Sequence, residues 1–141
     1  MSASTAAITA ARCAQHVTES VVGLLPAQLR LVGTAEQLVL VDADSGRTVA
    51  TQSVLTPSAG DADMVRVFAH HLLSDVQDLV VTHLRTPWPL SPDGAPQQVW
   101  TALEGRTVRL GFARAGAAAD RADTELPAFR LPSAGQVRTA G

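Results

Sequence analysis

The sequence is poor in the residue types that specialised sites most often use. The chain of 141 residues has one cysteine, two tryptophans, three phenylalanines and no tyrosine. Its single cysteine, Cys13, cannot form a disulfide within the chain, and it lies in a helical pattern where small apolar residues are expected. We therefore expect a structural role for Cys13.

An excess of positive charge is also absent. The formal net charge is −2, the isoelectric point is about 6.0, and all 11 basic residues are arginines. We attribute the arginine usage to GC-rich coding rather than to arginine-specific chemistry. Binding to nucleic acid or to an anionic membrane surface needs many basic contacts, so we expect neither as a partner.

Long apolar runs are missing as well. No stretch approaches the roughly 20 apolar residues that span a bilayer. The opening MSASTAAITAARC has neither the early positive cluster nor the continuous apolar segment of a signal peptide. We expect a cytoplasmic protein.

The composition is that of a folded domain. Apolar residues make up 46% and charged residues 17% of a chain long enough to bury a core. We expect one domain over residues 1–114. Residues 115–141 are rich in Ala, Gly, Pro and Asp and show no sustained period, which predicts a flexible tail.

The first half of the chain predicts one helix and three strands. Apolar residues recur at spacings of three and four over residues 5–24, which is typical of an amphipathic helix. The segments LRLVG (29–33), QLVLVD (37–42) and TVATQSVL (48–55) are separated by turn-forming GTAE and DADSG. Because the middle segment is apolar on both faces, we place it at the centre of the sheet.

The second half predicts a long helix followed by a hairpin. After the linker TPSAGDAD, Asp61 or Asp63 can cap a helix that runs to Leu84, before Pro87. The segments VWTAL (99–103) and TVRLGF (107–112) flank an EGR turn. The fold class is therefore α+β, in the order α-β-β-β-α-β-β, with an antiparallel sheet packed against two helices.

One loop carries a family resemblance. TPWPLSPDGAPQQVW (86–100) holds both tryptophans of the chain. Together with the preceding helix and the following hairpin, residues 65–112 resemble a group of small, largely uncharacterised actinobacterial proteins. In these, a helix leads into a W-P-x-C-P-x-H segment, an H-P-L and a V-W-x-C-P strand. Trp88, Pro89 and Pro92 match that pattern.

The departures from this group fall on its cysteines and histidine. Ser91 and Gly111 stand where the group has cysteines, and Gly94 stands at its histidine. The resemblance implies a metal site whose ligands are absent here. We therefore expect no zinc, no iron and no other cofactor.

The predicted long helix also carries a group that resembles a catalytic set. His71, Ser74 and Asp75 share one face of that helix. Three residues on an exposed helix face cannot supply a strained nucleophile and an oxyanion hole, so we interpret them as a solvated surface. The sequence favours a protein that is not an enzyme.

These observations lead to a first hypothesis, a non-enzymatic protein-interaction module such as a small adaptor, a chaperone-like protein or an accessory subunit. The apolar arc of helix 61–84 extends to Leu73, Val80 and Leu84, which is wider than one sheet face requires. This edge must meet a partner, a second copy in a homodimer, or the first helix. Trp88 and Trp100 are further candidates for partner binding.

The alternative hypothesis is a small-ligand-binding protein or an enzyme. Its pocket would lie between helix and sheet, near Trp88, Trp100 and His83, where aromatic and polar groups are expected at one end of the core.

Overall fold

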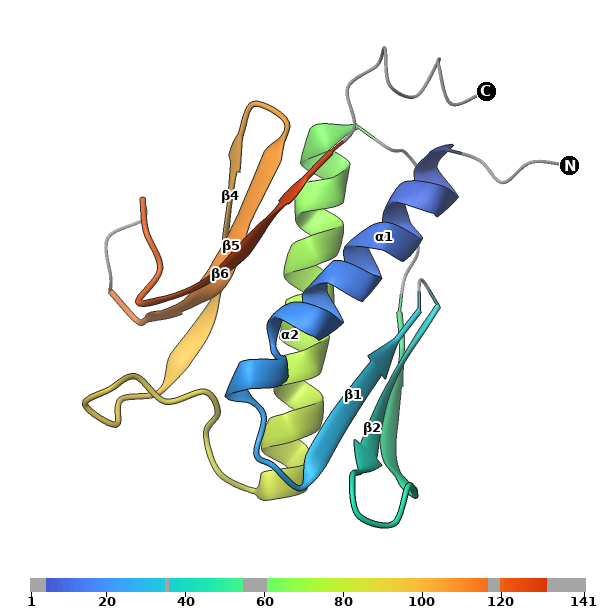
Figure 1. Ribbon diagram of the computed structural model, residues 1–141. Helices are drawn as coiled ribbons and strands as arrows, with labels where there is room; N and C mark the ends of the chain where they lie inside the picture. Colours follow the sequence, from blue (N-terminus) through green and yellow to red (C-terminus); the bar gives the residue numbers. More distant parts are fainter. Residues whose placement is uncertain (1–4, 35, 55–60, 117–119, 132–141) are drawn as a thin grey trace, which may run out of the picture.

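The computed structural model describes residues 5–34, 36–54, 61–116 and 120–131, without the side chains of residues 5–7. Two α-helices and two three-stranded antiparallel sheets follow one another in the order α-β-β-β-α-β-β-β. The predicted α+β class is confirmed. Strands lie on both sides of a helix pair, so two separate sheets form where a single sheet was expected (Figure 1).

The first half of the chain builds one helix and the first sheet. Helix α1 (Thr5–Ser20) is followed by a short 3₁₀ helix (Val22–Leu24). Strands β1 (Leu29–Gly33), β2 (Gln37–Asp42) and β3 (Thr48–Ser53) are hydrogen-bonded in the order β1-β2-β3. The three strands and the central place of β2 were predicted from the sequence and are confirmed.

Helix α2 (Ala62–Leu84) begins and ends with recognisable local signals. The carboxylate of Asp61 accepts a hydrogen bond from the Met64 backbone nitrogen at 2.8 Å, which satisfies one of the free amides of the first turn. Arg85 adopts the left-handed conformation, with φ of 58°, and stops the helix. The predicted helix is confirmed within one residue.

The second sheet contains one strand more than expected. Strands β4 (Gln97–Glu104) and β5 (Thr107–Arg114) form the predicted hairpin, and β6 (Thr124–Arg130) pairs with β5. The interpretation of residues 115–141 as a flexible tail is therefore wrong for β6. Residues 117–119 and 132–141 of that predicted tail, and residues 55–60 of the predicted linker, lie outside the described residues.

A bulge explains why β6 was missed. The β5–β6 register shifts between Val108 and Leu110, whose partners are Phe129 and Leu126. Leu126 and Phe129 are therefore both buried in the core although they are three residues apart. An extra residue in a strand interrupts the period of two that marks a strand in a sequence.

The helices lie between the two sheets (Figure 1). Both helices contact both sheets, α2 through β2, β3, β4 and β5 and α1 through β1 and β6, and the helices contact each other. Buried side chains from both helices and both sheets form one core cluster. None of the helices in the described residues is long and apolar enough to cross a membrane.

The chain is built as two successive units of one helix and three strands. In each unit the helix contacts its own first strand, α1 with β1 and α2 with β4. The last strand of each unit contacts the helix of the other unit, β3 with α2 and β6 with α1. Strand β6 is therefore an integral part of this arrangement.

Candidate functional site

Trp88 belongs to the core. Its side chain is buried, and its ring lies edge-on to Phe112 with centroids 5.7 Å apart. The indole nitrogen donates a hydrogen bond to the Leu24 carbonyl at 2.9 Å. The ring and its polar atom are thus both used within the chain, joining the 86–96 loop to the connection after α1.

Trp100 lies on the other face of the second sheet. Trp100 pairs with Gly111, so both residues face the same side of the sheet. Phe112 follows Gly111 in β5 and is buried on the opposite side, because successive residues of a strand face opposite sides. Trp100 is 9% exposed but does not belong to the core cluster. Because the sheet separates Trp100 from Trp88, the two rings do not line one pocket. His83 is exposed in the last turn of α2.

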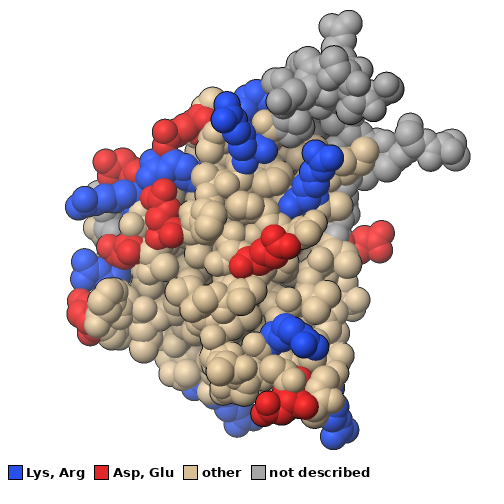
Figure 2. Space-filling model, viewed as in Figure 1, with Lys and Arg blue, Asp and Glu red and all other residues tan. Residues whose placement is uncertain are grey.

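An arginine covers the outer tryptophan. The Arg109 guanidinium carbon lies 5.0 Å from the centroid of the Trp100 ring. The same guanidinium donates to Glu104 at 2.7 Å and to Glu125 at 2.8 Å. Hydrogen bonds to Glu125 and Glu104 raise the pKa of Arg109. Acidic and basic side chains are interspersed on this side of the molecule, whereas few charged side chains lie over α1 (Figure 2).

The wide apolar edge of α2 is largely covered by the chain itself. Leu73 and Val80 are fully buried, in one core cluster with Cys13 and Val17 of α1, and Leu84 is partly buried against this cluster. No second molecule is needed to cover Leu73 or Val80. Helix α1 packs on α2 and contributes to the same core cluster. Packing by the first helix was one of the three alternatives that the sequence left open for this edge.

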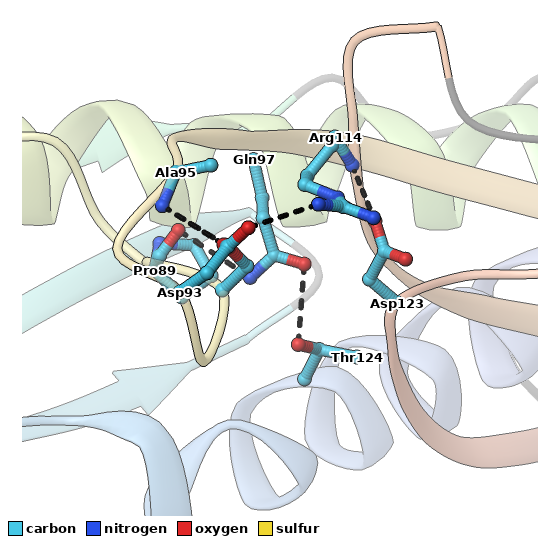
Figure 3. A network of polar contacts seen from close by, with 8 residues as sticks. Pro89, Asp93, Ala95, Gln97, Arg114, Asp123 and Thr124 are labelled. Carbon is cyan, nitrogen blue, oxygen red and sulfur yellow. Dashed lines mark hydrogen bonds and ion pairs between the residues drawn. The ribbon is translucent and has the colours of Figure 1, made fainter.

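A polar network connects the 86–96 loop to the second sheet (Figure 3). Arg114 of β5 donates to the Asp93 carboxylate at 3.0 Å, and its backbone nitrogen donates to Asp123 at 2.8 Å. The Ser91 hydroxyl donates to Asp93 and accepts from the Ala95 nitrogen at 3.1 Å. The hydrogen bond from Ser91, and then that from the Ala95 backbone, lower the pKa of Asp93.

Gln97 is the buried centre of this network. Its amide oxygen accepts from the Thr124 hydroxyl at 3.2 Å, and its amide nitrogen donates to the Pro89 carbonyl at 3.5 Å. Its backbone carbonyl accepts from the Gln77 side chain of α2 at 2.8 Å. The loop is thereby held to α2, β4 and β6, which makes it a structural connection.

The polar side chains of this network are used for contacts with one another, and they do not form a catalytic set. A hollow of about 310 Å³ is lined by Ser91, Pro92, Asp93, Arg114 and Asp123. Its serine donates to a carboxylate, no histidine lines it, and its charged groups are paired with one another. A serine without a neighbouring base is a poor nucleophile. Within the described ranges, no group of three or more His, Cys, Asp or Glu residues could hold a metal ion.

A second polar cluster lies between α2 and β4. The Thr101 hydroxyl lies 3.0 Å from the His70 Nδ1 atom and 3.4 Å from an Arg66 guanidinium nitrogen. Burial is the main cause that lowers the pKa of His70, and the nearby charges of His71 and Arg66 lower it further. Sequence reasoning missed this cluster because its members come from elements that only the fold brings together. On the neighbouring face His71 is exposed, while Ser74 and Asp75 are half-buried.

Strand β3 is the most open edge of the two sheets. It is the green strand beside β2 in Figure 1. All its side chains are exposed except that of Ala50, which is half-buried. Its sequence TVATQS contains neither a charged residue nor a proline. Natural sheets protect their edges with charges, prolines, bulges or covering elements. Strand β3 has no charge and no proline, and its one irregularity is the register shift at which Val49 is skipped between Ala50 and Thr48.

The other three edge strands are protected. On β6, Pro127 cannot donate to a further strand, and its carbonyl accepts from the His16 ring at 2.6 Å. On β4, the polar side chains of α2 bind Gln97 and Thr101. Strand β1 carries Arg30 and is the shortest of the four. In the described part of the chain, no hydrogen bond links Thr48–Ser53 to any element other than β2.

Comparisons with protein-family models, curated proteins and solved structures find no match. The resemblance of residues 65–112 to the actinobacterial group therefore stays a prediction, and the function of this chain has to be inferred from its geometry.

Proposed function

We propose that this protein is a non-enzymatic interaction module. Its protein partner would supply an extended segment that pairs with β3 as an additional strand of the first sheet. The observation that carries the proposal is the uncharged, proline-free and exposed edge formed by Thr48–Ser53. An extended segment can pair with such an edge through main-chain hydrogen bonds. This mode of binding suits a small adaptor, a chaperone-like protein or an accessory subunit.

The backbone of β3 has hydrogen-bonding groups directed away from the sheet. The Val54 nitrogen donates to the Glu36 carbonyl at 2.8 Å, so the Val54–Glu36 pair is hydrogen-bonded. In an antiparallel ladder, hydrogen-bonded and non-hydrogen-bonded pairs alternate along the strand. The pairs Ser53–Gln37 and Thr51–Val39 come one and three residues earlier. The N–H and C=O groups of Thr51 and Ser53 therefore point outward, where a partner strand would lie.

Side chains add to this surface. Val49 of β3 is 37% exposed and Val32 of β1 is 49% exposed. Thr51 pairs with Val39 on β2. A partner strand beside β3 would gain contacts with Val49 and Thr51 in addition to the backbone bonds, since neighbouring side chains on one face of a sheet interact.

The rest of the molecule supports a role without catalysis. The charged groups that line the hollow at Asp93 and Arg114 are paired. The alternative of a ligand pocket near Trp88, Trp100 and His83 has no support in the geometry, because the second sheet separates the two tryptophans.

The proposal can be tested by using the purified protein to capture partners from a lysate of a GC-rich bacterial host. Two variants of Thr51 are compared with the wild type. Thr51→Pro removes an outward N–H and places a ring at the edge, whereas Thr51→Val keeps the N–H and the β-branched shape. We expect a partner to be retained by the wild type and by Thr51→Val and lost by Thr51→Pro. Equal capture by all three would contradict strand addition at β3.

A thermal-shift screen against metabolites, nucleotides and metal ions tests the alternative. A ligand that binds the folded state stabilises it by mass action. A strong increase in Tm with one small molecule would favour a ligand-binding protein over an interaction module.

A further inference from the structure

We infer that the strand that pairs with β3 is the β3 of a second copy, so that the protein forms a two-fold symmetric dimer with a continuous six-stranded sheet. This inference rests on the proposed function and names its partner. Two identical strands can pair antiparallel about a two-fold axis, and such an interface uses the same surface on both subunits.

The outward N–H and C=O groups of β3 determine which residues of the two copies can lie opposite each other. A hydrogen-bonded pair across the axis needs residues whose N–H and C=O both point outward, and Thr51 is such a residue near the middle of β3. With Thr51 opposite Thr51 of the second copy, Ala50 faces Gln52 in regular pairing. Val49 then faces Ser53, but Val49 is the residue that the β2–β3 register skips, so the alternation of backbone groups ends there. Thr48 faces Val54, so the overlap spans residues 48–54, with regular pairing over residues 50–52.

The charge pattern suits this register. Residues 48–54 contain no charged side chain, and Arg47 lies immediately outside the overlap. Like charges placed opposite each other would oppose self-pairing, and none are brought together here. The threonine pair at the axis is a favourable cross-strand pair.

Protection of the other edges limits the assembly to two copies. Strand β6 carries Pro127, and α2 binds the backbone and side chains of β4. Pairing through β3 uses the same edge on both molecules, and two-fold pairing of one edge with itself is closed at two copies. A single strand pair is a small interface, and we expect a dissociation constant in about the micromolar range.

Sedimentation equilibrium of the full chain at micromolar concentration measures the association, with circular dichroism to follow folding. We expect a dimer for the wild type and for Thr51→Val. Thr51→Pro should weaken the dimer by about tenfold or more, because both copies lose a backbone bond at the axis. A monomeric wild type, or an unchanged dimer in folded Thr51→Pro, would overturn the inference.

Cross-linking tests the register without a proline. In a hydrogen-bonded pair the two Cα atoms are about 5.5 Å apart, within the range of a disulfide. Thr51→Cys should form a dimer linked by a disulfide under mild oxidation much faster than Val32→Cys, which places a thiol at another exposed position, on β1. Equal rates would also contradict the inference.

The two proposals fail in different ways. A monomeric wild type that still captures another protein, and loses it on Thr51→Pro, contradicts the homodimer and leaves the interaction module standing. If the substitution changes neither self-association nor capture, both proposals are wrong.

Discussion

Trp88 and Trp100 lie on opposite faces of the β4–β5–β6 sheet. Trp88 contacts the inward-facing Phe112 and belongs to the core, whereas Trp100 pairs with Gly111 and lies beneath Arg109 on the outer face. Trp88 precedes β4 in the chain, whereas Trp100 lies within β4. The two tryptophans of residues 86–100 therefore pack on opposite sides of one sheet.

Removal of all residues after Arg114 should severely destabilise the protein. Leu126, Phe129 and Leu131 would be lost from the core cluster. Deletion of one large buried side chain costs about 2–5 kcal/mol, and total stabilities are about 5–15 kcal/mol. Thermal unfolding followed by circular dichroism is the measurement. A truncated chain that melts near the wild-type temperature would show that β6 contributes nothing to the core.

A point substitution in β6 gives a finer test. Phe129→Ala should lower the free energy of unfolding by about 2–4 kcal/mol, because the buried ring leaves a cavity. Ala128→Ser, at an exposed neighbouring position, is the matched control and should change it by less than about 0.5 kcal/mol. Urea denaturation measures both.

Gly111→Ala should destabilise the second sheet. A Cβ atom at this position would clash with the Thr124 carbonyl oxygen and lie 3.0 Å from the Cβ of Ala122. We expect a loss of about 1–3 kcal/mol, because the obstacle is backbone of the paired strand and cannot rotate away. Gly23→Ala is the control, since a Cβ there meets no atom within 4 Å. Equal urea midpoints for the two variants would contradict the tight β5–β6 contact.

Cys13 should be unreactive in the folded protein. Burial raises the pKa of its thiol to about 12, so the reactive thiolate is scarce at neutral pH. Reaction with a chromogenic disulfide reagent should be slow without urea and fast above the unfolding midpoint. Rapid labelling of the native protein at pH 8 would show that the packing between α1 and α2 opens readily.

Acidification should destabilise the protein through His70. Burial, with the charges of His71 and Arg66, lowers the pKa of His70 below its ordinary value of 6.5. The unfolded chain therefore binds a proton first as the pH falls through about 6.5, and the equilibrium shifts toward unfolding. This destabilisation is absent above that pH and grows below it.

Comparison of variants isolates this contribution. His70→Gln should show a smaller loss of stability than the wild type between pH 7 and pH 5.5, because position 70 no longer titrates. His83→Gln changes an exposed histidine of the same helix and serves as the control. Urea midpoints at several pH values provide the data, and parallel curves for wild type and His70→Gln would contradict the assignment.

The purified protein should contain no stoichiometric zinc or iron. Ser91, Gly94 and Gly111 occupy the positions at which the resembling group carries its cysteines and histidine. Elemental analysis after removal of loosely bound ions measures the metal content. About one metal ion per chain would refute this prediction.

The sequence by itself determined the elements whose signals are local. The apolar spacing of α2, its cap at Asp61 and the position of Pro87 predicted that helix within one residue. Turn residues separated β1, β2 and β3, and the apolar character of β2 on both faces predicted its central place. Helix caps, turns and side-chain periodicity act between residues a few positions apart, so they can be read from the chain directly.

Only the tertiary structure decided which surfaces are covered and which remain open. Leu73 and Val80 are fully buried in one core cluster with residues of α1, and the Thr101 hydroxyl lies 3.0 Å from His70 Nδ1 between α2 and β4. Strand β6 joins the core despite a bulge that conceals its period, while β3 pairs with β2 alone among the residues that the structure describes. These outcomes depend on how two α-β-β-β units pack on each other. Contacts between residues distant in sequence leave no periodic trace in either segment alone.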